Sequence, residues 1–199
     1  MILPAKLAVF ISGSGTNLQS LIDAIKCGRL CAKIVLVVSS RSDAFGLERA
    51  KQEKIDTFLY KTKDYPTAED AERALLEALK GHEVEYVALA GFLKLAPDSV
   101  IQKYQNKITN IHPALLPKFG GKGMYGHFVH EAVIAAGEKE SGATVHIVDE
   151  TYDHGKILLQ KKVKIYPDDT PDTLAARVLR IEHQIYPEAL ELLIRGKIE

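Results

Sequence analysis

The first half of the chain alternates short apolar runs with segments whose apolar residues recur at helical spacing. The runs predict β-strands at residues 7–11, 33–39, 57–60, 86–90 and 107–111. The segments between them predict helices at residues 17–27, 46–54, 68–79 and 98–104. Strands that alternate with helices in this way build a parallel sheet with right-handed crossovers and helices on both of its faces.

After Pro113 the pattern changes. Residues 127–136 predict a helix, and residues 144–149 and 157–165 predict two strands. The acidic turn at residues 150–155 joins these strands, and so short a link favours an antiparallel hairpin.

The C-terminal segment predicts a long amphipathic helix over residues 169–195. Thr170 is a plausible cap and Pro171 suits the first turn, whereas Pro187 is expected to kink the helix or split it in two. Together these elements predict a single α/β domain over residues 1–199. Its core is an open, mostly parallel twisted sheet with helices on both faces, followed by an antiparallel hairpin and a long helix.

Charge and composition narrow the possible functions. The 26 Lys and Arg residues balance the 26 Asp and Glu residues, which argues against a nucleic-acid partner because such proteins need a basic face. The apolar stretch at residues 86–93 is too short to cross a bilayer, and we expect no signal peptide. Cys27 and Cys31 have the spacing of neither a zinc knuckle nor a redox pair. We therefore expect a cytoplasmic protein with no nucleic-acid partner and no membrane partner. A monomer and a homodimer are both compatible with the sequence, and small-molecule substrates are expected in either case from the family resemblance given below.

Residues 12–18 read Ser-Gly-Ser-Gly-Thr-Asn-Leu and connect the first predicted strand to the first predicted helix. Glycines at such a turn let backbone N–H groups approach an anion, and the helix start adds partial positive charge. A dinucleotide fingerprint needs a third glycine where Leu18 stands, and a nucleoside-triphosphate loop needs a lysine. The loop is interpreted as a monophosphate cradle that also uses the hydroxyls of Ser14 and Thr16. The alternative is a tight turn with Thr16 as the helix cap.

Asn110 and His112 lie at the end of the fifth predicted strand, just before Pro113. Strand side chains alternate, so both point to one face at the carboxyl edge of the sheet, where open α/β sheets bind ligands. An amide beside an imidazole can stabilise an oxyanion and move a proton. The alternative is a buried histidine that only packs. Asp153, in the acidic turn, would orient His112 and favour its charged form if the fold brought the two together.

Three further features leave alternatives open. The glycine-rich connection at residues 113–126 is either a substrate lid or an ordinary surface loop. His146 lies inside an apolar strand, which favours a hydrogen-bonded core histidine over a ligand. His, Cys and Asp residues show no convincing metal-ligand spacing, so no metal is expected.

Five segments, taken together and in order, resemble the glycinamide ribonucleotide formyltransferases, which are folate-dependent enzymes of purine biosynthesis. These segments are ISGSGTNLQSLIDAI, LAGFLKL, NIHPALLPKFGGKGMYG, ATVHIVDETYDHG and IEHQIYPEAL. The resemblance covers essentially the whole chain and implies a Rossmann-like formyltransferase fold. It also implies formyl transfer from 10-formyltetrahydrofolate, as co-substrate, to the amine of 5'-phosphoribosylglycinamide, without a metal.

The resemblance implies roles for individual residues as well. Asn110, His112 and Asp153 would be the catalytic trio, with His112 as proton donor and Asp153 raising its pKa. Glu182 would bind near the glycinamide amine. Where many members carry a basic residue this chain has Ala68. The remaining substrate contacts would come from Gly13, Ser14, Gly15, Thr16 and Asn17 for the ribonucleotide, and from Leu93, Lys94, Leu95, Ala96 and Asn110 for the folate.

Two related enzymes and one binding protein are the alternatives. Formyltetrahydrofolate deformylase shares the Asn-x-His pair and the aspartate, but we expect it to carry an extra N-terminal module. Methionyl-tRNA formyltransferase is expected to have a C-terminal RNA-binding domain and a basic surface. A non-catalytic nucleotide-binding module would bind a sugar phosphate at the glycine loop, while Asn110 and His112 only packed.

Overall fold

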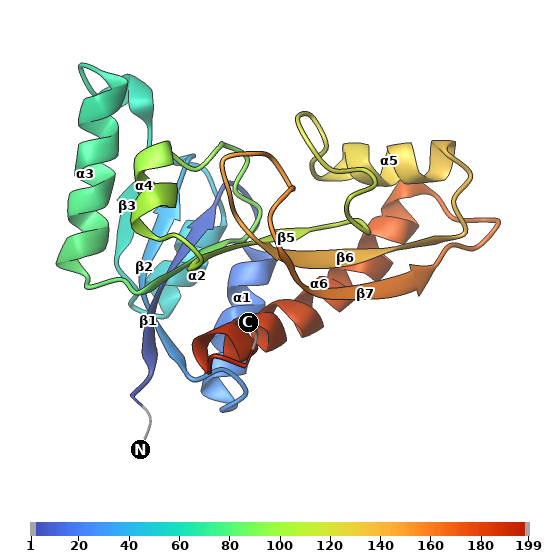
Figure 1. The fold of residues 1–199 in the computed structure, drawn as a ribbon, viewed down its shortest axis with the longest axis horizontal. Helices are drawn as coiled ribbons and strands as arrows, with labels where there is room; N and C mark the ends of the chain where they lie inside the picture. Colours follow the sequence, from blue (N-terminus) through green and yellow to red (C-terminus); the bar gives the residue numbers. More distant parts are fainter. Residues whose placement is uncertain (1–2, 198–199) are drawn as a thin grey trace. The chain divides into compact units, whose positions relative to one another are not determined.

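The computed structural model describes residues 3–197, and the chain divides into two compact units, Met1–Ile108 and Thr109–Glu199. The helices and strands of each unit are drawn in Figure 1. None of the helices within residues 3–197 is long and apolar enough to cross a membrane. The expectation that residues 1–199 form a single domain stays a prediction.

The N-terminal unit contains four parallel strands in the order β3-β2-β1-β4. The strands are β1 (Ala5–Ile11), β2 (Ala32–Ser39), β3 (Thr57–Leu59) and β4 (Tyr86–Leu89). The helices are α1 (Thr16–Lys26), α2 (Gly46–Gln52), the 3-10 turn η1 (Thr62–Asp64), α3 (Ala68–Gly81) and α4 (Asp98–Lys103).

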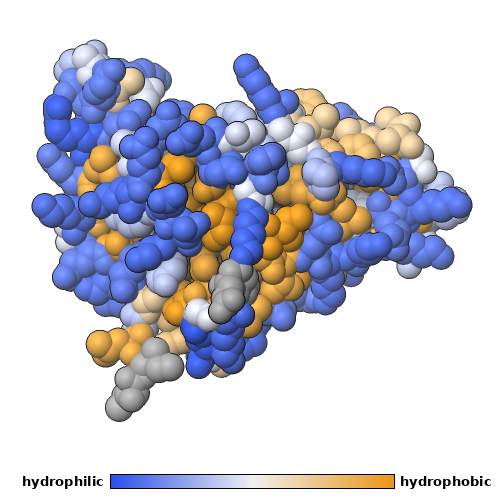
Figure 2. Space-filling model, in the orientation of Figure 1, coloured by the Kyte–Doolittle hydropathy of each residue, from blue (hydrophilic) through white to orange (hydrophobic). Residues whose placement is uncertain are grey.

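Burial explains why β1 and β2 form the centre of this unit. Val9, Phe10, Val37 and Val38 are completely buried, as expected of strands covered by helices on both faces. Helix α1 contacts α2, whereas α3 contacts α4. The outer side of α3 is covered by hydrophilic residues (Figure 2), so its amphipathic pattern has placed the apolar face inward.

The C-terminal unit is an antiparallel sheet covered by helices. It consists of β5 (Ile108–His112), α5 (His127–Ala135), β6 (Glu140–Ile147), β7 (Ile157–Lys164) and α6 (Pro171–Ile194). Strand β6 pairs antiparallel with both β5 and β7. Helix α6 packs against β6, β7 and α5, and its ribbon runs along the strands in Figure 1.

The predicted order of strands and helices is confirmed, as are the parallel strands, the hairpin and the Thr170 cap, which forms a capping box. One boundary is displaced, because β6 begins at Glu140 rather than at residue 144. Its first residues are polar or small and carry little strand propensity. Pairing with β7, from Glu140 opposite Lys164 onward, supplies the order that local sequence does not.

The helix boundaries exclude two of the alternatives that the sequence left open. Helix α6 is not split at Pro187 but continues as one helix of 24 residues. A proline inside a helix costs about 3 kcal/mol, and the complete burial of Tyr186 and Leu190 on either side offsets that cost. Helix α1 is capped by Gly15 and not by Thr16, because the left-handed backbone at Gly15 places Thr16 already in the helix.

Candidate active site

Asn110 and His112 lie on β5 and share one face of the strand, while Ile111 packs on the other. His112 is 3% exposed. The chain leaving β5 is held by Thr144 of β6, whose hydroxyl donates to the Ala114 carbonyl at 2.6 Å. The end of β5 is therefore a fixed support for these two side chains.

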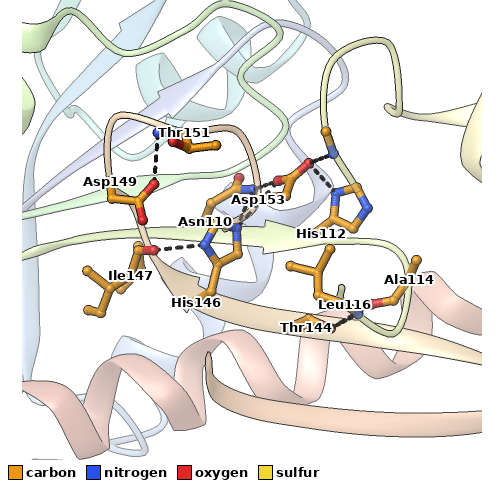
Figure 3. Close-up of polar contacts among 12 residues, drawn as sticks. Asn110, His112, Ala114, Leu116, Thr144, His146, Ile147, Asp149, Thr151 and Asp153 are labelled. Atoms are coloured by element: carbon orange, nitrogen blue, oxygen red, sulfur yellow. Dashed lines mark hydrogen bonds and ion pairs between the residues drawn. The ribbon is translucent and has the colours of Figure 1, made fainter. Parts of the chain in front are cut away.

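Asp153 reaches both residues from the turn between β6 and β7 (Figure 3). Its backbone has a φ of +53°, which is uncommon for a residue other than glycine. Its Oδ1 accepts from Asn110 Nδ2 at 3.3 Å, and its Oδ2 lies 3.5 Å from His112 Nδ1. The fold thus brings the three predicted catalytic residues into contact.

The imidazole of His112 faces an acceptor at each nitrogen. Nε2 lies 2.8 Å from the carbonyl oxygen of Phe119, so in the neutral ring this nitrogen carries the proton. Nδ1 faces Asp153, and only the doubly protonated ring satisfies both contacts. Burial has the larger influence, however, and lowers the pKa of His112 below its usual 6.5, although the charge of Asp153 acts to raise it. The expected influence of Asp153 thus has the predicted direction, but burial outweighs it and the net shift is downward.

The carboxylate of Asp153 is stabilised as an anion. Burial alone would raise its pKa, but the neighbouring His146, the charge of His112 and the N–H of Gly121 outweigh burial, so the pKa lies below its usual 3.8. The Gly121 N–H donates to Oδ2 at 2.9 Å. A buried carboxylate with a lowered pKa beside two histidines is the arrangement expected of a group that orients and charges an imidazole.

His146, which the sequence predicts to be a core histidine, is also part of this cluster. It is 2% exposed, and its Nδ1 lies 2.8 Å from the Ile147 carbonyl oxygen. Its Nε2 lies 3.1 Å from Asn110 Nδ2 and 3.5 Å from Asp153 Oδ1. The signal that identifies it is the antiparallel register, in which Asn110 and His146 are direct partners on one face.

Both hydrogens of the Asn110 amide have partners. One points to His146 Nε2 and the other to Asp153 Oδ1. The opposite amide orientation would set an oxygen against the Asp153 carboxylate, so the network favours this one. The 3.3 Å bond to Asp153 is the longer of the two, and its hydrogen is therefore the easier one to offer to another acceptor.

The connection between β5 and α5 contributes main-chain groups to the cluster through the Phe119 carbonyl and the Gly121 N–H. A Cβ on Gly120 would lie 2.6 Å from Leu116 Cδ2 and 3.1 Å from the Cβ of Asp153, so glycine permits the close approach. These contacts favour a functional interpretation of the connection over that of an ordinary surface loop.

The glycine loop belongs to the N-terminal unit, and its backbone conformation explains why glycine occupies position 15. Gly15 has a φ of +69° and caps α1, with no side chain bonded to the first helical N–H groups. A Cβ at Gly15 would lie only 2.6 Å from the Gly46 Cα of α2, so glycine is required there. The loop therefore presents backbone donors at the start of a helix of 11 residues.

The segment predicted to bind folate follows β4 in the same unit. Leu93 and Leu95 are 54% and 41% exposed, so this segment presents apolar surface to its surroundings. The Leu93 N–H donates to the hydroxyl of Ser12 at 2.9 Å, and this hydroxyl also lies 2.6 Å from that of Ser40. Ser12 thus ties the predicted folate segment to the beginning of the glycine loop.

Comparison with known proteins decides the family. The model of the formyl transferase family matches residues 5–190. The chain belongs to the formyl transferase family. The resemblance found in the sequence is thereby confirmed, and the chain is a formyltransferase by its family and its relatives' names.

Its relatives among the formyl transferases are similar over nearly the whole chain. Phosphoribosylglycinamide formyltransferase of Haemophilus influenzae is 40% identical over 97% of this chain and 89% of its own length. The chloroplastic enzyme of Vigna unguiculata is 46% identical, and the chain spans 62% of its length. A crystal structure of glycinamide ribonucleotide transformylase 1 from Symbiobacterium toebii has a TM-score of 0.91 at 38% identity, covering 98% of this chain and 90% of the other.

The formyl transferase fold predicted from the sequence, open and mostly parallel with an antiparallel end, is thus confirmed.

Glu182 of α6 is buried, 8% exposed. Within residues 3–197 no group of three or more His, Cys, Asp or Glu side chains could hold a metal ion. Lys61, seven residues before Ala68 in the sequence, donates to the hydroxyl of Ser42 at 2.9 Å.

Proposed function

We propose that this formyltransferase moves the formyl group of 10-formyltetrahydrofolate to the amine of 5'-phosphoribosylglycinamide. The products are formylglycinamide ribonucleotide and tetrahydrofolate, and the reaction belongs to purine biosynthesis, as the names of its relatives indicate. The observation that carries the proposal is the placement of Asp153 against both Asn110 and His112 in a chain of this family.

The reaction begins when the ribonucleotide amine attacks the formyl carbon. The new C–N bond forms as the carbonyl electrons move to oxygen, which becomes an oxyanion. The Nε2–H of His112 donates to this oxygen in place of the Phe119 carbonyl, and Asn110 offers the hydrogen of its longer bond. Loss of one such donor typically reduces the rate about a hundredfold or more.

The intermediate collapses when the bond from the formyl carbon to the folate nitrogen breaks. The proton lost by the attacking amine must reach that nitrogen, and His112 carries it. Asp153, 3.5 Å from Nδ1, stabilises the imidazolium while the proton is held. Burial lowers the pKa of His112 in the free protein, and the negative oxyanion favours the charged form of His112 during the reaction.

Binding is divided between the predicted subsites. Gly13, Ser14, Gly15, Thr16 and Asn17 hold the phosphate of the ribonucleotide, chiefly through backbone N–H groups. Glu182 pairs with the substrate amine. Leu93, Lys94, Leu95 and Ala96, with Asn110, contact the folate, for which the exposed leucines offer apolar surface. We further propose a cytoplasmic monomer or homodimer that binds no nucleic acid.

The decisive experiment follows the consumption of 10-formyltetrahydrofolate by absorbance, with and without the ribonucleotide. We expect consumption that depends on the ribonucleotide and yields one formylated product per folate. Equal consumption in its absence, with release of formate, would identify a deformylase. Binding of the ribonucleotide without any consumption would identify a nucleotide-binding module.

A further inference from the structure

Two consecutive carbonyl groups of the glycine loop are held by residues of α2. The Gly13 carbonyl accepts from the Gly46 N–H at 3.1 Å. The Ser14 carbonyl accepts from Arg49 Nε at 2.9 Å, across 35 residues of sequence. The loop is therefore supported from one side by a segment that belongs to none of the predicted substrate contacts.

This support determines where the loop points its donors. In a trans peptide the C=O and the following N–H point in opposite directions. Drawing the Gly13 and Ser14 carbonyls toward α2 therefore turns the Ser14 and Gly15 N–H groups away from it. Within residues 3–197 neither of these two N–H groups donates to a backbone carbonyl. Successive N–H groups that converge in this way form an anion-binding concavity.

The side chain of Arg49 is itself held in place. Its Nη1 donates to Gln19 Oε1 of α1 at 3.0 Å, and its guanidinium lies 5.2 Å from the centre of the Phe45 ring. A rigid, planar fork with three partners loses less freedom on binding than a flexible lysine would. Its bond to the Ser14 carbonyl is thus set before any ligand arrives.

We propose that Arg49 is a positioning residue for phosphate binding, acting through the Ser14 carbonyl to orient the Gly15 N–H. The proposal rests on the proposed function, in which the glycine loop binds the ribonucleotide phosphate. The geometry of the Arg49 guanidinium matters as well as its charge. A lysine would keep the charge but could not hydrogen-bond both Ser14 and Gln19 with one planar group.

The test measures the binding of two ligands by calorimetry: the ribonucleotide and the same molecule without its 5'-phosphate. Arg49→Lys should weaken binding of the phosphorylated ligand about tenfold and leave binding of the dephosphorylated one unchanged. Arg41→Lys is the matched control, since Arg41 lies between β2 and α2 but pairs with Asp43. It should change neither affinity.

Phe45→Leu provides a second, milder variant, because Phe45 is 57% exposed and its ring only supports the guanidinium. It should produce a smaller loss in the same direction. Full affinity in Arg49→Lys, or equal losses for both ligands, would overturn the inference while leaving the proposed function intact. If the wild-type protein binds both ligands equally well, the phosphate role of the loop itself is wrong.

Discussion

Replacing Asp153 by asparagine is the most informative single change in the C-terminal unit. The carboxylate accepts from Gly121 N–H at 2.9 Å and from Asn110 Nδ2 at 3.3 Å. It also faces His112 and His146, each at 3.5 Å. Its side chain is only 10% exposed, so water screens these contacts little.

An amide of the same shape does not fit this environment in either orientation. With its NH₂ toward Asn110, two donors meet at the 3.3 Å contact. With its NH₂ toward Gly121, two donors meet at the 2.9 Å contact. Either arrangement leaves a buried donor without an acceptor, which costs about 1–3 kcal/mol. We therefore expect Asp153→Asn to lower the free energy of unfolding by that amount and still to fold.

The kinetic effect should be larger than the effect on stability. Burial already lowers the pKa of His112, and the charge of Asp153 is the main opposing influence. Removing that charge lowers the pKa further, so protonated His112 persists only at lower pH. The alkaline limb of kcat should move to lower pH, and kcat should fall by about 10²- to 10⁴-fold.

The assay is kcat against pH for Asp153→Asn, His112→Ala and the double variant. Because the two groups act as one unit, the double variant should be little worse than the poorer single variant. Asp149→Asn is the matched control, since Asp149 lies in the same turn but accepts from Thr151 N–H and not from the trio (Figure 3). Additive losses with an unmoved alkaline limb would refute the link between Asp153 and His112.

Three further changes test other parts of the molecule. Gly15→Ala should weaken ribonucleotide binding and lower the Tm by more than Gly28→Ala, because both glycines have positive φ but only Gly15 has a close neighbour, Gly46. Glu182→Gln should raise the KM for the ribonucleotide more than that for the folate; an unchanged ribonucleotide KM would remove Glu182 from the site. Burial, with His127 and His112, lowers the pKa of His130 from 6.5 to about 4, so its contribution to stability is present above pH 6.5 and is lost as pH falls toward 4. His130→Gln should reduce the acid loss of unfolding free energy by about 3 kcal/mol, and equal acid sensitivity in chemical denaturation would contradict this.

The parallel strands could be predicted closely because their runs of buried apolar residues carry the signal locally. The sequence predicts a strand β6 that is too short at its start. The first residues of β6, from Glu140 onward, are held in the strand by pairing with β7 rather than by local propensity. Pro187 does not split α6, because local propensity takes no account of the buried face of that helix. In each case tertiary contacts outweighed a local preference.

The cluster around Asp153, proposed to be catalytic, shows the same limit more sharply. The alternation of β5 predicts that Asn110 and His112 share a face, and the contacts confirm it. Asp153 is 43 residues from Asn110 in the sequence, so their contact depends on the tertiary fold. Phe119 and Gly121 contact the cluster through main-chain atoms, which every residue type possesses, so their contacts cannot be predicted from residue identity. The net pKa direction of His112 depends on burial, which no motif reports.

The glycine loop and the cluster around Asp153 share one principle of construction. In each, a short motif at the end of a strand provides the groups that would meet substrate, and a distant segment sets their direction. Arg49 does so for Ser14, and Gly121 does so for Asp153. The motifs alone are compatible with a turn or a packed histidine, because both are common in proteins that bind nothing there. In a turn that binds nothing, there is no reason for two consecutive carbonyls to be held on one side. An aspartate that only forms a turn would be exposed to solvent and would not lie buried against two histidines. Variants of the supporting residues are therefore the sharper tests of function, since they leave every substrate-contacting group chemically intact and change only where it points.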